Sequence, residues 1–441
     1  MAEVGKPRQI RIEFPEADLD RLQRKLDDAR LPESEITGGL EPWEYGTELS
    51  KLRQVLDDWK AGNPKDSHRR PVGSSGQGVK TWWRSVEDKL NKYPHYKVQI
   101  EGIDVHYQHF KSSIPDDEAG MPAIPLIFSH GWPGCFAEGY YFASKLVESR
   151  APRFEVIVPS LPGYGLSPGP LKKGWTLGDT GRVFDTLMTS VLGFKSYMAQ
   201  GGDWGSIVTR FIANSPNCKI AHINFAPPTP PLWSLPALAL EQSGYKGIAP
   251  KSLRLLGYHP QEVVGIERTL SYLEKGNAYT RIQGTQPSTL GYGLYDNPVG
   301  ILSWIMEKYY AWSDPRCPAF NDSNTDASPH SFVTDQDILT TVMIYYLTNS
   351  IHTSFLPYRE SMHFFNKPDW KVWEANKETP FGYSNFPYEA LAGPKSWLSK
   401  YRLNWQFYKM HDYGGHFAAL DNPDALVEDM QEFANRHWPG F

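Results

Sequence analysis

The chain has 441 residues, of which 40% are apolar and 22% charged, and its formal net charge is −5. This composition is ordinary for a globular protein, and the charge gives no reason to expect nucleic acid or an anionic membrane surface as a partner. The first ten residues lack the apolar segment of a signal peptide, and no stretch of about 18 apolar residues occurs, so we expect no membrane anchor.

The three cysteines, Cys135, Cys218 and Cys317, are odd in number and widely spaced. A disulfide framework in a small secreted protein normally uses an even number of cysteines. We therefore expect reduced thiols and a cytoplasmic location.

The first part of the chain shows two helical patterns followed by two extended ones. Leucines recur at near-helical spacing after Phe14, and a second helical pattern covers roughly 48–61. The stretch 62–78 is rich in Gly, Pro, Ser and basic residues, which predicts an exposed loop. Alternating patterns at 97–101 and 103–110 predict antiparallel strands.

Strands and helices alternate in the next part of the chain. Apolar runs at 124–130 and 154–159 predict two buried strands, a helix is expected over about 177–192, and a further strand near 220–225. This alternation predicts a parallel sheet whose ligands bind beyond the carboxyl ends of its strands. The glycine-rich loops that follow the strands all fall on that edge.

The pattern changes at Pro227, where a Pro-rich linker leads into helices with many aromatic residues. We expect these helices to form a lid inserted into the core, with a polar surface loop at 313–331. Strand patterns resume near 377–386 and at 403–410, and a last helix is expected over about 422–437. The predicted organisation is an N-terminal extension wrapping the core at 1–96, the first part of the core at 97–226, a helical lid at 227–370 and the second part of the core at 371–441.

The sequence Ser196-Tyr-Met-Ala-Gln-Gly-Gly-Asp203-Trp-Gly-Ser206 joins a strand-like run to a helix-like run. Its glycines stand two residues before and two after Asp203, which is the layout of the strand-turn-helix elbow of α/β-hydrolases. Side chains beside the nucleophile would collide in so tight a turn, so Gly201 and Gly205 leave room for it. The predicted fold class is therefore α/β, an α/β-hydrolase fold with a mostly parallel sheet flanked by helices.

An aspartate stands where a serine esterase would have its serine. A carboxylate can attack a saturated carbon and form a covalent alkyl ester, which points to epoxides or alkyl halides as substrates. A Gly-Gly-Asp stretch is also typical of a plain turn, and an aspartate before a helix is a good N-cap. The motif by itself leaves both interpretations open.

An ester on Asp203 must be hydrolysed, which needs a general base and a group to orient it, in the chain order nucleophile, acid, histidine. His416, on the glycine-rich loop before the last helix, is the favoured base, and His411 near the strand end is its competitor. Glu389 is the only carboxylate in the loop after the preceding strand, whereas Glu378 stands before that strand. A solvated loop histidine and a first-turn helix glutamate are the plain alternatives for His416 and Glu389.

The tetrahedral intermediate of ester hydrolysis needs backbone N–H donors. Trp204, directly after the expected nucleophile, supplies one donor, and Trp132 in the His130-Gly-Trp-Pro loop is placed to supply the other. We expect His130 itself to be a structural loop histidine.

Several stretches carry a joint resemblance, and they span most of the chain: FPEADLDRLQRKLDDARLP, WEYGTELSKL, HGWPG, PSLPGYGLS, GGDWGS, FGYSNFPYEAL and GGHFAALDNP. Together they resemble the microsomal-type epoxide hydrolases, including soluble fungal and bacterial members with the characteristic N-terminal domain. The resemblance implies Asp203 as nucleophile, Glu389 as acid and His416 as base. It also implies two lid tyrosines that hydrogen-bond the epoxide oxygen, Tyr279 in GNAYTRIQG and Tyr358 in HTSFLPYRES.

The implied reaction is hydrolysis of an epoxide to a vicinal diol through an ester on Asp203, with no metal or cofactor. The expected partners are a small apolar epoxide and water, and relatives that resemble this chain are often homodimers. A haloalkane dehalogenase would use the same aspartate chemistry, but a halide leaving group needs no phenolic donors. A hydrolase-fold protein used only for binding is the alternative from another class.

Overall fold

The computed structural model describes residues 4–64, 78–115, 121–170, 172–228, 247–320, 333–361 and 377–439. Most of the predicted loop at 62–78 and the second half of the predicted loop at 313–331 lie outside these residues. The predicted boundary between the lid and the second part of the core, at residue 370, also lies outside them, and the domain limits stay a prediction.

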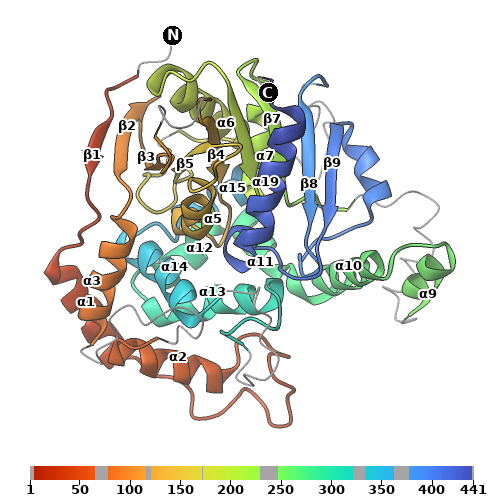
Figure 1. Cartoon of the computed structure of the whole chain (residues 1–441). Coiled ribbons are helices and arrows are strands. Elements are labelled where there is room, and N and C mark those ends of the chain that lie inside the picture. The colour runs from red at the N-terminus through yellow and green to blue at the C-terminus, as the bar shows by residue number, and fades with distance from the viewer. Residues whose placement is uncertain are drawn as a thin grey trace.

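In the described part of the chain, nine strands form one sheet in the order β1-β2-β3-β5-β4-β6-β7-β8-β9 (Figure 1). Strands β1, β2 and β3 pair antiparallel with one another, and β3 pairs antiparallel with β5. The remaining six strands, β4 to β9, run parallel. Both the predicted antiparallel pair and the predicted parallel sheet are confirmed. The strands are β1 (Arg8–Ile10), β2 (His95–Ile100), β3 (Ile103–Phe110), β4 (Ile124–Ser129), β5 (Phe154–Pro159), β6 (Tyr197–Gly201), β7 (Cys218–Ile223), β8 (Pro380–Asn385) and β9 (Asn404–Met410).

The middle strands read as nearly continuous apolar runs because both of their faces are covered. All six residues of β4 and all five of β6 are buried. Helices α5 and α19 contact each other on one face of the sheet, and α6 and α7 do so on the other (Figure 1). The core helices are α5 (Gly139–Leu146), α6 (Leu177–Thr186), α7 (Asp203–Ile212), α18 (Ala418–Asp421) and α19 (Pro423–His437).

The N-terminal segment contributes β1 and three helices, α1 (Glu16–Asp27), α2 (Leu49–Ala61) and α3 (Val79–Leu90). In α1 the buried residues Leu19, Leu22 and Leu26 lie on one face, because positions three and four apart share a side of a helix. The sequence analysis predicted α1 and α2 but not α3. Its buried tryptophans, Trp82 and Trp83, face the core from the middle of that helix.

The N-terminal segment packs on the lid as well as on the sheet, since α1 and α2 both contact α13. Nζ of Lys51 lies 3.1 Å from Oδ1 of Asp335, and both side chains are nearly inaccessible to solvent. Arg21 and Asp296 form a second, more exposed pair at 2.5 Å. The extension therefore holds the lid as well as the core.

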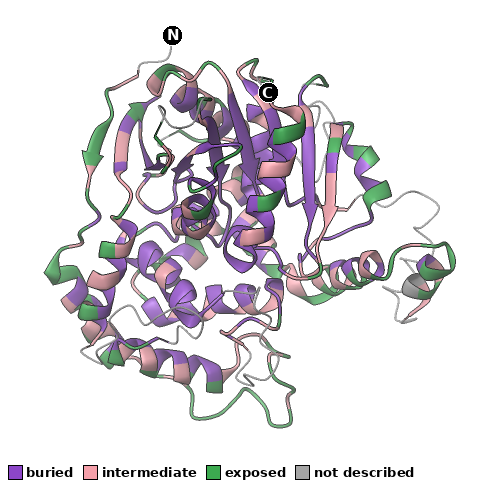
Figure 2. Cartoon of the chain, in the orientation of Figure 1, coloured by how far each residue is buried: buried purple, intermediate pink, exposed green. Residues whose placement is uncertain are grey.

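The lid lies between β7 and β8 in the chain and covers the carboxyl edge of the parallel strands (Figure 1). Figure 2 shows that its inner helices, α13 and α14, are buried to an extent similar to that of the sheet. Its helices are α9 (Ile248–Leu255), α10 (Pro260–Ser271), the π-turn η4 (Tyr272–Gly276), α11 (Ala278–Thr285), α12 (Pro287–Tyr295), α13 (Pro298–Trp312), α14 (Asp335–Leu347) and α15 (Leu356–Ser361).

The prediction of a surface loop at 313–331 is wrong for its first half. Ser313, Asp314, Cys317 and Ala319 are buried beneath the lid. Asp314 is polar because it accepts hydrogen bonds from backbone and guanidinium groups inside the protein, which the local composition does not reveal.

One continuous apolar cluster joins the sheet, the inner lid helices and the N-terminal helices. The three cysteines are buried and free, as expected. Within the ranges that the structure describes, no helix combines the length and apolarity needed to cross a bilayer.

Candidate active site

Asp203 is the first residue of α7, and only Gly202 separates it from the end of β6. The N-cap of α7 is Gly202, so Asp203 does not serve as the helix cap. Its φ angle is +47°, a left-handed conformation that costs a non-glycine residue about 1–3 kcal/mol. A carboxylate held in such a strained turn favours the elbow interpretation over the plain N-cap.

The two glycines around the elbow are required by close backbone approaches. A Cβ atom on Gly205 would lie 1.9 Å from the carbonyl oxygen of Ser129, at the end of β4. A Cβ atom on Gly201 would lie 2.3 Å from the carbonyl oxygen of Gly205. The elbow is thus packed against the neighbouring strand with no room for side chains on either flank.

The carboxylate of Asp203 is held by the loop that follows β4. The backbone N–H of Trp132 donates to Oδ1 of Asp203 at 2.7 Å. Gly131 allows this approach, because a Cβ atom there would lie 2.2 Å from the same oxygen. Trp204 follows Asp203 in the chain at the start of α7, the position from which its N–H would act as the second predicted donor.

His416 lies between two carboxylates. Its Nδ1 is 2.8 Å from Oε1 and 3.0 Å from Oε2 of Glu389, and its Nε2 is 3.4 Å from Oδ2 of Asp203. Burial by itself would lower the pKa of His416, but the charged and hydrogen-bonded Glu389 carboxylate, together with the nearby Asp203 carboxylate, outweighs it and raises the pKa to about 10. The predicted nucleophile, base and acid therefore lie in one chain of contacts.

The competing residues lie elsewhere. Nε2 of His411 is 2.7 Å from Oδ2 of Asp429 on α19, and its ring stacks on Phe386. Glu378 stands before β8, on the far side of the strand from Glu389. His130 is buried and accepts a hydrogen bond from the N–H of Leu161, as expected of a structural loop histidine.

The two lid tyrosines reach the elbow from different helices, Tyr279 from α11 and Tyr358 from α15. Their ring centroids are 5.7 Å apart. Tyr279 stacks on Trp132 at 5.1 Å, and Tyr358 meets Trp204 edge to face at 4.7 Å. Burial raises the pKa of both phenols well above 10, and the Asp203 carboxylate acts in the same direction.

A cavity of about 230 Å³ joins these groups. Asp203 and His416 line it on the core side, and Tyr279 and Tyr358 line it on the lid side. Most of the remaining wall is apolar, as expected of a pocket for a small organic ligand. Other residues of the wall include Trp204, Phe225, Tyr272, Trp312 and Leu391.

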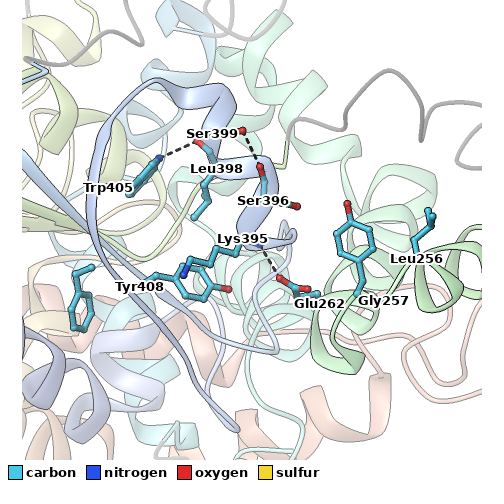
Figure 3. A pocket seen from close by; sticks show the side chains of 11 residues that line it. Leu256, Gly257, Glu262, Lys395, Ser396, Leu398, Ser399, Trp405 and Tyr408 are labelled. Atoms are coloured by element: carbon cyan, nitrogen blue, oxygen red, sulfur yellow. Dashed lines mark hydrogen bonds between the residues drawn. The ribbon is translucent and has the colours of Figure 1, made fainter.

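A larger cavity of about 760 Å³ lies between the end of α9, α10, the 3₁₀ helix η6 (Lys395–Tyr401) and β9 (Figure 3). Glu262 accepts a hydrogen bond from the backbone N–H of Lys395 at 2.9 Å on its wall. None of the predicted site residues lines this cavity. We therefore assign the chemistry to the smaller cavity.

Sequence reasoning missed two residues near the elbow. The hydroxyl of Tyr272 lies 3.0 Å from the hydroxyl of Tyr279, and nothing in the sequence distinguishes Tyr272 from the many other aromatic residues of the lid. Glu138 lines a cavity of about 10 Å³ together with Asp203 and His416, and burial raises the pKa of its carboxyl to about 8. Its place eight residues after His130 gives no sign of this contact in the sequence.

Among the residues that the structure describes, no group of three or more histidine, cysteine, aspartate or glutamate side chains could hold a metal ion. Glu389, His416 and Asp203 instead form one chain of contacts, with His416 between the two carboxylates.

The parallel sheet, the elbow carboxylate and the histidine after the last strand define a hydrolase of the α/β class. A family model described as "alpha/beta hydrolase fold" matches residues 124–242, and one described as "Epoxide hydrolase N terminus" matches residues 7–139. The predicted fold class is confirmed.

Epoxide hydrolase 1 of Sus scrofa is 32% identical over 449 residues, which cover 98% of this chain and 89% of that protein. The solved structure of Aspergillus niger epoxide hydrolase is 29% identical, with a TM-score of 0.76 and 98% and 97% of the two chains covered. The juvenile hormone epoxide hydrolase from the silkworm Bombyx mori is 26% identical, with a TM-score of 0.77 and 98% and 95% covered. The chain belongs to the epoxide hydrolase family, as the resemblance predicted.

Proposed function

We propose that this enzyme hydrolyses small apolar epoxides to vicinal diols through a covalent ester on Asp203. The observation that carries the proposal is that one cavity holds a candidate nucleophile with its base on one side and hydrogen-bond donors on the other. A carboxylate in contact with a histidine forms one side, and two buried phenols form the other. The roles assigned to individual residues below are part of the proposal.

In the first half-reaction, a carboxylate oxygen of Asp203 attacks one epoxide carbon and the carbon–oxygen bond of the ring breaks. The departing oxygen develops negative charge and needs hydrogen-bond donors. Tyr279 and Tyr358 are suited to this role because their raised pKa values keep the phenols protonated at neutral pH. Each donor would supply about 3 kcal/mol, by analogy with oxyanion holes.

The leaving oxygen takes a proton from a phenol and becomes the first hydroxyl of the diol. The histidine can restore that proton. With a pKa of about 10, His416 is protonated while Asp203 is charged. Esterification removes that charge, which lowers the affinity of His416 for its proton. His416 then loses the proton towards the phenolate and is neutral when the ester is complete.

In the second half-reaction, neutral His416 accepts a proton from a water molecule, and the hydroxide attacks the carbonyl carbon of the Asp203 ester. The cavity of about 10 Å³ between Glu138, His416 and Asp203 is about the size that holds one water molecule. We assign the attacking water molecule to this cavity, and we assign Glu138 the role of holding that water by a hydrogen bond. Glu389, 1% exposed, orients the imidazole and balances its charge.

The tetrahedral intermediate carries its negative charge on a former carboxylate oxygen of Asp203. The N–H of Trp132, which lies 2.7 Å from Oδ1 in the resting enzyme, and the N–H of Trp204 are the proposed donors to that oxygen. Collapse of the intermediate breaks the bond between the carbonyl carbon and the diol oxygen. That oxygen takes the proton of the hydroxyl group that water added, so the diol leaves, Asp203 returns to a carboxylate and His416 stays protonated as in the resting enzyme.

Styrene oxide and a bromoalkane of similar size test the proposal against a haloalkane dehalogenase. Diol formation from the epoxide, with no halide release from the bromide, is the expected result. The phenols favour the epoxide, because a halide leaving group needs no proton. Halide release without diol formation would assign the aspartate to the other reaction.

A single turnover in heavy-oxygen water tests the ester itself. Because water attacks the carbonyl carbon of Asp203, the labelled oxygen is expected in the aspartate of the enzyme, and the diol formed in that turnover keeps an unlabelled aspartate oxygen. Mass spectrometry of the peptide containing Asp203 measures the label. Label found only in the diol would mean that water attacks the epoxide directly.

A further inference from the structure

We propose that Asp314, at the end of lid helix α13, is a positioning residue for His416, so that the lid holds the general base in place. The inference rests on the proposed function, because it assigns His416 to ester hydrolysis. It concerns a segment that sequence reasoning took for a surface loop. Four contacts carry it.

The first contact is made with the backbone two residues before His416. Oδ2 of Asp314 accepts a hydrogen bond from the N–H of Gly414 at 3.1 Å. Only Gly415 separates that peptide from His416. Asp314 is fully buried. Removing its carboxylate would therefore leave the N–H of Gly414 without a hydrogen-bond partner, which is costly inside a protein.

The second contact is made by the residue two positions earlier. The N–H of His416 donates to the carbonyl oxygen of Trp312 at 2.8 Å. The indole ring of Trp312 also meets the imidazole at a centroid distance of 5.0 Å and 66° between planes. We call residues 411–417, between β9 and α18, the base loop because they carry His416. The segment from Trp312 to Asp314 thus contacts the base loop at Gly414, at the His416 backbone and at the His416 ring.

The third contact fixes the carboxylate of Asp314 itself. Arg316 binds it through two nitrogens, Nε at 2.8 Å to Oδ1 and Nη2 at 2.5 Å to Oδ2. The backbone N–H of Asp314 in turn donates to Oδ2 of Asp421 at 2.9 Å, on the helix that follows the base loop. A bidentate guanidinium pair sets the plane of a carboxylate as well as its position.

The fourth contact brings in the loop that carries the acid. The N–H of Tyr388 donates to the carbonyl oxygen of Gly414 at 3.1 Å, and Glu389 follows Tyr388 directly. Nη2 of Arg268 donates to the carbonyl oxygens of Tyr388 and Ala311, at 2.9 and 2.8 Å. The backbone of Gly414 therefore links Asp314 of the lid, through its N–H, to the loop that carries Glu389, through its carbonyl oxygen.

This arrangement matters more for one half-reaction than for the other. In the alkylation step, the attack on the epoxide carbon and the opening of the ring depend on Asp203 and the phenols, none of which contacts Asp314 through a hydrogen bond or ion pair in the described residues. Hydrolysis of the ester needs the imidazole aligned with water and with the ester carbon. A misplacement of about 1 Å can slow such a step by about a hundredfold.

Single-turnover kinetics of Asp314→Asn test the inference, with styrene oxide as substrate and mass spectrometry to count alkylated enzyme. The amide keeps the size of the side chain but puts an N–H group opposite either Gly414 or Arg316. We expect an unchanged alkylation rate and ester hydrolysis slowed by about tenfold to a hundredfold, so that alkylated enzyme accumulates at steady state.

Two further variants keep the result interpretable. Arg316→Met removes the partner of Asp314 from a half-exposed position and should slow ester hydrolysis in the same way but less, even if Asp314→Asn fails to fold. Asp296→Asn, which removes a lid carboxylate 39% exposed and paired with the N-terminal segment, should leave both half-reactions unchanged.

Equal losses in both half-reactions, or no loss in either, for Asp314→Asn and Arg316→Met would overturn the positioning role. A wild-type enzyme that forms diol but never an ester on Asp203, even when His416 is replaced by Gln, would instead overturn the proposed function. The two failures are thus distinguishable.

Discussion

Nε2 of His416 lies 3.4 Å from Oδ2 of Asp203, close enough for the charge of the carboxylate to hold a proton on the imidazole. In the proposed mechanism the carboxylate becomes an ester, and that support then disappears, so that the histidine can act as a base. The contact would thus link the protonation state of the base to the progress of the proposed reaction.

Replacing His416 by Gln should leave alkylation and block hydrolysis of the ester. After mixing with an epoxide, intact-protein mass spectrometry should show the protein heavier by one substrate molecule, because no base activates water. Asp203→Ala is the matched control, since it lacks the nucleophile. An adduct on Asp203→Ala would place the nucleophile at another residue.

Tyr279→Phe and Tyr358→Phe should each slow alkylation by about a hundredfold, because each removes one donor to the epoxide oxygen. Quenching of tryptophan fluorescence in a stopped-flow instrument can follow the step, since Trp132 and Trp204 pack on these rings. Tyr292→Phe, on the same lid but 74% exposed, is the control with unchanged kinetics. An unchanged rate for either buried tyrosine would remove it from the mechanism.

Gly205→Ala should destabilise the protein strongly or prevent folding, because its Cβ atom would meet the carbonyl oxygen of Ser129 at 1.9 Å. The expected loss is more than about 3 kcal/mol in the free energy of unfolding, measured with denaturant. Gly293→Ala, on lid helix α12 with nothing within 4 Å of its Cβ position, should instead gain about 0.5–1 kcal/mol. Equal stabilities for the two variants would contradict the packing of the elbow.

Stability should fall as the pH is lowered from 6.5 towards 4. Burial lowers the pKa of His95 and His130 to about 4 and that of His222 to about 3. Because the unfolded chain binds protons at these residues from about pH 6.5 while the native protein does not, their contribution is complete above pH 6.5 and is lost below it. His416, with a raised pKa, contributes in the opposite sense, fully below pH 6.5 and decreasingly towards pH 10.

Each buried histidine contributes at most about 1.4 kcal/mol per pH unit to this slope. Denaturant unfolding of the wild type and of His222→Gln at about pH 6.5 and about pH 5 measures it. The glutamine can still hydrogen-bond Ser384 but does not titrate, so the variant should lose less stability on acidification. The exposed His259→Gln should show the wild-type slope, and an identical slope for all three proteins would contradict the assignment.

Local sequence was sufficient for the strands of the core and for the residue types of the site. The apolar run of β4 is buried on both faces, and that is visible in the sequence as a nearly unbroken series of apolar residues. Glycine spacing around Asp203 was equally informative, because a tight turn restricts the residues on both of its flanks. Helix α3 was missed because its neighbouring tryptophans suggest a strand as readily as a helix.

The sequence by itself determined that a carboxylate stands at a hydrolase elbow, that a histidine loop follows the last strand, and that the chain belongs with the epoxide hydrolases. Such features depend on neighbours in the chain. Only the tertiary structure decided that His416 and not His411 faces Asp203, that Glu138 and Tyr272 stand beside the site, and that Asp314 is buried against the base loop. These contacts join residues that are far apart in the sequence, and the burial and charge around each group arise only when the lid closes over the sheet.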